Sequence, residues 1–330
     1  MRLVDDLIAE RRLLDALDML TEMNRRHRDP VIEERLVLLR RDAFSVLEHS
    51  EGRPSWPPVF DDPFKGVDDL IEIDAAHLSL ETLGGAIQHH GHVLVRGLIP
   101  PATVDRLVDA IDQAFRARDA WEGGAPVSET APWYVPVPSH PRYPTVDAIQ
   151  RLSPSKVLVV DSPRALFELT EAFSEAGLDR LVGDYLGDRP VMAENKWALR
   201  RMNRKDDKAP WHQEASVFDC GPLRTVNVWL TLSAAGTNAP GFQFIPRRME
   251  SIIEPDLKFG LTAETMGAVA DHETIAAPLY EPGDAVLFDE YLVHRTKAGP
   301  EMRGIRHSIE SWMFAPAGHP LRERLGPVVL

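Results

Sequence analysis

The feature that most constrains this chain is a pair of residues, His212 and Glu214, in the stretch PWHQE. Side chains at positions i and i+2 of a β-strand point to the same face, so an imidazole and a carboxylate would converge there. A second histidine, His294, follows far downstream, after a Pro-Gly turn signal and a short apolar run typical of a strand. Two histidines and one carboxylate on one face of a metal form the ligand set of non-heme Fe(II) oxygenases. We therefore expect a β-rich fold that brings these distant segments together around one metal ion.

Each histidine alone supports a weaker interpretation. A histidine in a strand is more often packed and hydrogen-bonded than bound to a metal. The run of His89, His90 and His92 has no carboxylate at a spacing that would complete a metal site, and we interpret it as a polar turn. For the set of two histidines and a glutamate, the convergence of three suitable ligands favours a metal.

Charge and composition limit the classes of partner. The 330-residue chain has a net charge of −14, which argues against a basic groove for nucleic acid. No apolar run approaches the ~20 residues of a membrane span, and acids near the N-terminus replace the basic residues of a signal peptide. A single cysteine excludes an internal disulfide. We expect a cytoplasmic protein that acts on a small molecule and has no nucleic-acid or membrane partner.

The N-terminal part of the chain, residues 1–50, has the pattern of a helical hairpin. Residues 3–27 and 31–48 each carry apolar side chains at spacings of three, four or seven, and Asp29-Pro30 separates them. One hairpin is too little for a tetratricopeptide array, which needs about three repeats. We interpret it as a helical cap or a dimer contact, and a docking module for a carrier protein remains the alternative.

Residues 51–74 are rich in proline and glycine, which indicates a linker or a wrapped arm. From residue 75 to residue 330 the pattern is that of one compact domain. Helices are expected from Pro101 and over 163–186. Short strands are expected at 92–97, 191–200, 225–232, 242–245, 285–288 and 305–314. Many short strands between turn signals predict a sandwich or barrel, of which the jelly roll is one form.

Several landmarks follow His212 in a fixed order: V-W-L-T-L at 228–232, A-P-G-F-Q-F-I-P-R at 239–247, P-G-D at 282–284, His294, and then Arg306. This order and spacing resembles the phytanoyl-CoA dioxygenase family of Fe(II)/2-oxoglutarate oxygenases. The resemblance covers about residues 75–316 and leaves the hairpin outside. It implies an α+β fold with a double-stranded β-helix core, of the jelly-roll or cupin type, flanked by helices. It also implies Fe(II), 2-oxoglutarate as cosubstrate, and O2.

The same resemblance implies roles for individual residues. The metal ligands would be His212, Glu214 and His294. Arg306 would hold the distal carboxylate of 2-oxoglutarate, a task that suits a planar and permanently charged guanidinium. Thr296 would offer a hydroxyl to that carboxylate, and Trp229 would pack beside the cosubstrate.

Arg303 is a rival anchor, but it precedes Gly304 and is expected in a loop, so we favour Arg306. The family normally has aspartate where this chain has Glu214. Its longer side chain must fold back or bind bidentately to keep metal–oxygen distances near ~2.0–2.2 Å. The departure argues against a halogenase-like variant, which needs a small residue at this position.

The reaction that the resemblance implies is hydroxylation of an aliphatic C–H of a small biosynthetic intermediate, with release of succinate and CO2. Desaturation, epoxidation or cyclisation at the same site, a catalytically silent metal- or partner-binding protein, and a jelly-roll hydrolase or isomerase without 2-oxoglutarate stay open. Four arginines flank the site in sequence: Arg200, Arg201, Arg247 and Arg248. A solvated rim is the favoured interpretation of them, and an anionic or carrier-linked substrate the other. A homodimer also stays open.

Overall fold

The computed structural model describes residues 1–50, 55–145, 151, 153–203, 210–217, 223–257, 260–270, 275–319 and 325–330. The chain forms two compact units. We call Met1–Pro54, Arg106–Leu199 and Met313–Leu330 the helical unit, and Ser55–Asp105 with Arg200–Trp312 the β unit. The division into 1–50, 51–74 and 75–330 remains a prediction, and residues 51–54 of the expected linker lie outside the described part. None of the described helices combines the length and the apolar character that crossing a membrane requires.

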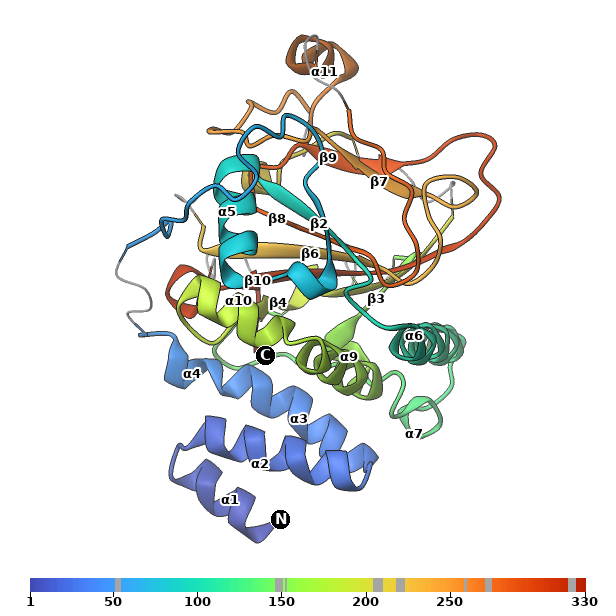
Figure 1. The fold of residues 1–330 in the computed structure, drawn as a ribbon. Helices are drawn as coiled ribbons and strands as arrows, with labels where there is room; N and C mark the ends of the chain where they lie inside the picture. Colours follow the sequence, from blue (N-terminus) through green and yellow to red (C-terminus); the bar gives the residue numbers. More distant parts are fainter. Residues whose placement is uncertain are drawn as a thin grey trace. The chain divides into compact units, whose positions relative to one another are not determined.

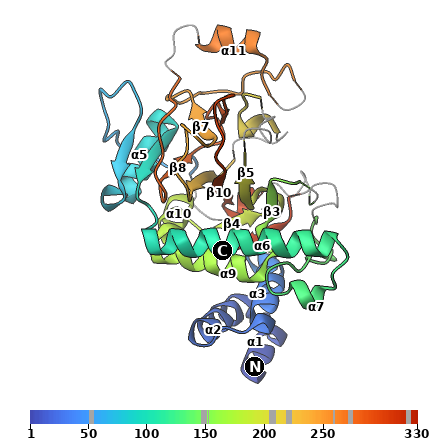
Figure 2. The ribbon, with the colours of Figure 1, turned by 90° about the vertical axis from the view of Figure 1, so that its right-hand side faces the viewer.

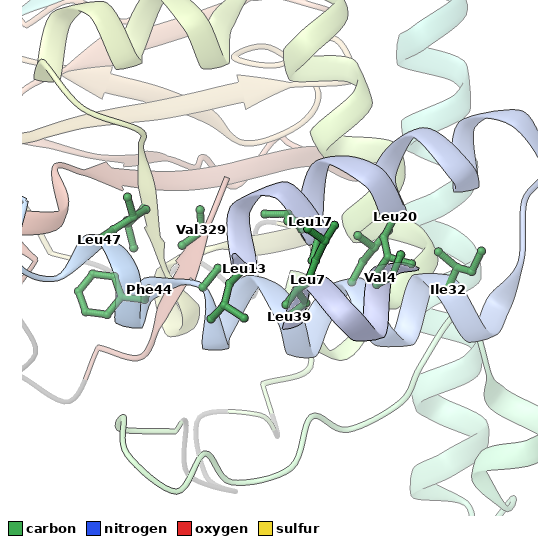
Figure 3. Packing of buried hydrophobic residues seen from close by; sticks show 14 of the residues in the cluster. Val4, Leu7, Leu13, Leu17, Leu20, Ile32, Leu39, Phe44, Leu47 and Val329 are labelled. Carbon is green, nitrogen blue, oxygen red and sulfur yellow. The ribbon is translucent and has the colours of Figure 1, made fainter. Parts of the chain in front are cut away.

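The chain begins with four helices: α1 (Arg2–Ala9), α2 (Leu13–Arg26), α3 (Pro30–Asp42) and α4 (Phe44–Leu47). The single helix expected over 3–27 is wrong, because the chain reverses at Arg11, which has a φ of 58°. The reversal lets α1 and α2 bury side chains in one common core, including Val4, Leu7 and Leu17 (Figure 3). Leu3, which the pattern assigned to the apolar face, is 57% exposed.

The hairpin of α2 and α3 shares its core with the rest of the helical unit. Phe167 on α9 (Pro163–Glu175), Val191 on β4 (Val191–Ala193) and Val329 on β11 (Pro327–Val329) belong to the same cluster. Figure 3 shows Val329 beside the residues of the first helices. The buried Glu33 of α3 adds ion pairs with Arg28 at 2.9 Å and with Arg164 at 2.6 Å. The hairpin is therefore packed as an integral part of its unit.

Further helices pack in the helical unit. One helix or a pair was expected over 163–186, and the structure shows a pair, α9 and α10 (Leu178–Leu186). The helix expected from Pro101 is confirmed as α6 (Pro101–Glu122), which lies along α9 (Figure 2). Arg106 joins the two helices through ion pairs with Glu168 at 3.1 Å and Glu175 at 2.8 Å. The same unit also contains the short helix α7 (Val127–Thr130) and the strand β3 (Lys156–Leu158).

The β unit contains most of a large sheet, with strand order β1-β2-β8-β6-β10. The strands are β1 (Glu72–Asp74), β2 (His92–Arg96), β6 (Thr225–Thr231), β8 (Ala285–Phe288) and β10 (Arg306–Phe314). β1 runs parallel to β2, while β8 pairs antiparallel with both β2 and β6. β10 continues into the helical unit, where Met313 and Phe314 pair with β4. Helices α5 (Leu80–His90) and α11 (Ala263–Ala270) also belong to the β unit.

A second sheet consists of β7 (Gly241–Phe244) and β9 (His294–Lys297), which pair antiparallel (Figure 1). The two sheets enclose an aromatic core that includes Trp229, Phe242 and Phe288. The expected strands are confirmed within one or two residues, except that 191–200 divides into β4, a 3-10 turn and β5 (Ala198–Met202). The chain turns there because buried Glu194 is fixed by its backbone bond to Gly326 and its ion pair with Arg41.

Candidate active site

A β-bridge brings the two predicted histidine ligands together. The amide of His212 donates to the carbonyl of His294 at 3.1 Å, and the amide of His294 donates back at 3.0 Å. The ring centroids lie 4.3 Å apart. His294 is the first residue of β9, so the second sheet carries one ligand directly and aligns the other through the bridge.

Glu214 is positioned differently from the expectation. It begins a 3-10 helix (Glu214–Val217) and does not lie on an extended strand with His212. The backbone turns because the amide of Ala215 donates to the carbonyl of Glu290 at 2.9 Å. The longer side chain of glutamate nevertheless brings Oε1 to 3.8 Å from Nε2 of His212 and 3.5 Å from Nε2 of His294.

The three donor atoms form a set that fits a metal ion. All three lie within 4.8 Å of one another. Among the described residues, this is the group of three histidine, cysteine or acidic side chains whose donor atoms come close enough to share a metal ion. Donors bound at ~2.0–2.2 Å to one face of an ion, at angles of about 90–110°, lie about 2.8–3.6 Å apart. The separation of 3.5 Å from His294 falls within that range, and the separation of 3.8 Å from His212 is slightly longer.

Backbone carbonyls orient both imidazoles. Nδ1 of His212 lies 2.9 Å from the carbonyl oxygen of Pro210, and Nδ1 of His294 lies 2.9 Å from that of Leu292. A carbonyl can only accept, so each Nδ1 carries a proton and Nε2 is the ring nitrogen that lies on the side of the carboxylate. This orientation leaves Nε2 for a metal and supports an iron site.

Gln213, between two of the predicted ligands, was missed by the sequence reasoning. Its buried amide donates to the carbonyls of Tyr291 at 2.7 Å and Ser251 at 3.2 Å, and its oxygen accepts from the amide of Ile253 at 2.7 Å. The side chain therefore fixes the ligand segment to two neighbouring loops. Its position between two residues that were expected on one face is a signal that its side chain points the other way, into the protein.

Aromatic residues close one side of the metal ligands. The ring of Phe242 stacks on His294 with centroids 5.0 Å apart, and Phe288 meets His294 edge-on at 5.0 Å. Phe242 is also 5.1 Å from Trp229 in a stacked arrangement. The sequence reasoning named Trp229 and missed the two phenylalanines, which the strand alternation of β7 and β8 would have placed inside.

Arg306 is buried beside this aromatic group, with 1% of its surface exposed. Its guanidinium donates to Ser308 Oγ at 3.1 Å and to the carbonyl of Gly241 at 3.1 Å, and Nη2 lies 2.9 Å from the sulfur of Met202. The guanidinium carbon lies 5.3 Å from the centroid of the Trp229 ring. Contacts thus run without interruption from Arg306 through Trp229 and Phe242 to His294.

The rival anchor, Arg303, is exposed and donates to the loop carbonyl of Met302 at 3.1 Å. Thr296 is partly buried on β9, two residues after His294 and opposite Phe242 in the strand register. His294 and Thr296 therefore share one face of β9. This arrangement favours Arg306 over Arg303 and is compatible with the position expected for Thr296.

Among the flanking arginines, Arg200 and Arg248 have acidic partners. Arg200 pairs with Glu310 at 2.7 Å, and Arg248 lies 3.5 Å from the buried Asp289. Burial raises the pKa of Asp289 and, together with the neighbouring carboxylate of Asp289, that of Glu290. Pairing with protein carboxylates is what the solvated-rim interpretation of Arg200 and Arg248 predicts.

The other histidine run is not a second metal site among the described residues. His92 is fully buried rather than in a polar turn, because it begins β2, and its Nε2 accepts from the amide of Ile71 at 3.3 Å. Its Nδ1 lies 3.0 Å from the carbonyl of His90. Burial lowers the pKa of His92 to about 4.

Comparison with known proteins identifies relatives of the fold. The family model of phytanoyl-CoA dioxygenase matches residues 87–305, a range that ends immediately before Arg306. No curated protein matches the chain. Similar solved structures include EctD from S. alaskensis with 2-oxoglutarate and 5-hydroxyectoine, at a TM-score of 0.53 and 14% identity over 79% of this chain and 90% of that chain. The apoform of that protein aligns at a TM-score of 0.51 and 17% identity over 82% and 86%.

These findings confirm two expectations. The family match confirms the resemblance drawn from the order of motifs. The likeness to EctD confirms an α+β fold with a cupin-like jelly-roll core. The roles of the individual site residues rest on the geometry above.

Proposed function

Since the chain belongs to the phytanoyl-CoA dioxygenase family, it is an Fe(II)- and 2-oxoglutarate-dependent oxygenase, and we propose that it hydroxylates an aliphatic C–H of a small biosynthetic intermediate. His212, Glu214 and His294 bind the iron in this proposal. The observation that carries it is the meeting of these three donor atoms within 4.8 Å, from segments far apart in the sequence.

The protein prepares the ligands before the metal arrives. Both imidazoles are held by a proton on Nδ1, so each ring presents Nε2 to the metal. The carboxylate of Glu214 supplies one negative charge to the divalent ion. When bound, Fe(II) and 2-oxoglutarate supply O2 activation and C–H oxidation, with succinate and CO2 as the other products.

Arg306 binds the distal carboxylate of 2-oxoglutarate in this proposal. Its burial keeps the charge poorly screened, which strengthens a charge-assisted hydrogen bond. Nη2 faces the sulfur of Met202, a weak acceptor that a carboxylate would replace. Trp229 covers the guanidinium, and Phe242 and Phe288 exclude water from the side of His294.

The test is succinate formation from 2-oxoglutarate under Fe(II) and O2, measured across candidate substrates and in the Arg306→Ala variant. Losing charge-assisted hydrogen bonds costs about 2–3 kcal/mol, or about a 30- to 150-fold weaker affinity for 2-oxoglutarate. Arg303→Ala is the matched control, because it removes an arginine that is exposed and bonded within its loop. Equal affinities in the two variants would remove Arg306 from this role.

The reaction type is assigned by the mass of the product. Hydroxylation adds one oxygen atom to the substrate, and desaturation or oxidative cyclisation removes two hydrogens. Epoxidation also adds one oxygen but consumes a double bond. A substrate that has no double bond and gains one oxygen therefore supports hydroxylation, and loss of two hydrogens contradicts it.

A further inference from the structure

The ion pair of Arg200 and Glu310 lies in the β unit, on the face of the large sheet that carries Arg306. Arg306, Ser308 and Glu310 alternate along β10, and Arg306 Nε donates to Ser308 Oγ at 3.1 Å, so their side chains share this face. Met202 of β5 belongs to the same face, because its sulfur lies 2.9 Å from Arg306 Nη2. Arg200 precedes Met202 by two residues, and its Nη2 donates to Glu310 Oε2 at 2.7 Å. The pair is therefore on the face that the candidate active site uses.

Glu310 lies beside Trp229, a residue of the candidate active site. β6 and β10 are neighbours in the sheet, and the amide of Leu232 donates to the carbonyl of His307 at 2.9 Å. β6 ends just before Leu232, whereas β10 continues beyond His307, so the two strands run antiparallel from this bond. Three residues along each strand, Trp229 and Glu310 are neighbours. The ion pair thus adjoins the row of contacts that leads through Trp229 to His294.

Along the strands, the pair lies between the level of Arg306 and that of the metal ligands. On the other side of β6, Val286 of β8 is opposite Trp229, so Phe288 lies one step further from Arg306. Phe288 meets His294 edge-on, with ring centroids 5.0 Å apart. A molecule that is placed for oxidation at the metal would therefore lie close to the ion pair.

Solvent reaches this pair although its neighbours on the same face are closed to it. Arg306, Ser308 and Trp229 are 1%, 0% and 3% exposed. In contrast, 22% of the Arg200 side chain and 30% of the Glu310 side chain are exposed. An ion pair with this exposure contributes little to the stability of a fold. Its two charges are, however, accessible to a molecule that binds on this face.

We propose that the Arg200–Glu310 pair binds a zwitterionic group of the substrate, with a carboxylate against Arg200 and an ammonium group against Glu310. This inference rests on the proposed function, since it names the substrate class of the same site. A guanidinium has several N–H donors and a carboxylate has several acceptor positions, so both can bond to more than each other. Glu310 would repel a molecule that is only an anion, and Arg200 one that is only a cation. The pair therefore selects molecules that carry both charges.

The geometry of the pair also limits the distance between the two charges of the substrate. Nη2 of Arg200 and Oε2 of Glu310 are 2.7 Å apart, so the complementary charges must be adjacent as well. An α-amino acid meets this requirement, because its ammonium and carboxylate groups are attached to one carbon. Its side chain then remains available for oxidation.

The test is calorimetric titration of the full chain, loaded with Fe(II) and 2-oxoglutarate in the absence of O2, with each standard L-amino acid in turn. For every amino acid that binds, the amine that lacks its carboxylate and the acid that lacks its ammonium group are titrated as well. We expect saturable binding of at least one amino acid, and binding of its amine and its acid that is weaker by about tenfold or more. The inference is overturned if no amino acid binds, or if an amine or an acid binds as tightly as its amino acid. Failure to load 2-oxoglutarate would instead refute the proposed function, and the inference with it.

Variants distinguish binding of the substrate from binding of the cosubstrate. Arg200→Gln and Glu310→Gln should each weaken binding of the best amino acid by about tenfold or more, and change the affinity for 2-oxoglutarate by less than about twofold. Glu72→Gln is the matched control, because it breaks another partly exposed ion pair, with Arg96 at 2.9 Å, on the edge strand β1 of the same sheet. The control should bind the amino acid as the unaltered chain does.

Two results with the variants would overturn the assignment. Equal amino-acid binding by Arg200→Gln and Glu72→Gln would remove the pair from substrate recognition. A loss of affinity for 2-oxoglutarate in Arg200→Gln would show that Arg200 binds the cosubstrate instead. If a variant does not fold, the titrations of the unaltered chain with matched amino acid, amine and acid decide alone.

Discussion

Gln213 offers the sharpest test of how the candidate iron site is supported. Replacing it by leucine removes two bonds that its amide donates and one that its oxygen accepts from Ile253. Each lost hydrogen bond costs about 1 kcal/mol where water can reach the partner, and up to about 3 kcal/mol where it cannot. We therefore expect the Gln213→Leu variant to lose about 3–5 kcal/mol of unfolding free energy.

The Gln213→Leu change should also weaken the binding of Fe(II). The bonds of Gln213 connect the segment of His212 and Glu214 to the loop that leads into His294. Loss of groups that orient metal ligands typically costs about 10- to 100-fold in affinity. We expect a loss of that order for Fe(II), measured anaerobically by titration, with urea unfolding of the metal-free chain giving the stability.

Gln88→Leu is the matched control in the same unit. The oxygen of Gln88 accepts one hydrogen bond, from the amide of Phe60 at 2.7 Å, and no metal ligand lies on that segment. This variant should lose about 1 kcal/mol and keep its Fe(II) affinity. If Gln213→Leu loses stability but binds Fe(II) as tightly as the unaltered chain, the residue supports the fold only and the reasoning is refuted.

Glu214→Asp keeps the charge but withdraws the carboxylate by about 1.5 Å, so Fe(II) titration should show at least tenfold weaker binding; equal affinity would mean that the backbone can follow. Burial lowers the pKa of His92, so its neutral side chain stabilises the fold above pH 6.5, and this stabilisation is lost as the pH falls toward 4. The free energy of unfolding should therefore fall by about 2 kcal/mol between pH 7 and pH 5. Urea unfolding at the two pH values checks this loss, which should diminish in His92→Gln. Glu33→Gln breaks a buried ion-pair cluster, and the same assay should show a loss of about 3–5 kcal/mol, whereas a loss below 1 kcal/mol would contradict the burial argument.

The sequence was most informative where chemistry restricts the residue type. His212, Glu214 and His294 were identified because few other residues bind Fe(II), and Arg306 because few can hold a carboxylate in a buried place. The structure brings these residues together, but through a local geometry that periodicity did not predict. Glu214 reaches the site from a 3-10 turn, and that turn depends on a hydrogen bond to Glu290, which is distant in sequence.

Residues that act through tertiary contacts were less visible in the sequence. Gln213 and Phe242 have ordinary side chains, and their importance arises from distant segments that they contact: the loop residue Tyr291 for Gln213, and His294 on the neighbouring strand for Phe242. The break between α1 and α2 was missed for a related reason. The apolar spacing of both segments suits one long helix, and only the common core that they fill requires the reversal at Arg11.

The N-terminal hairpin remains the part of the chain whose purpose the family does not explain. A single pair of helices cannot bury its apolar face alone, and here Phe167, Val191 and Val329 cover that face. A carrier protein therefore cannot use the same apolar face without disrupting the core, which favours the cap over the docking module.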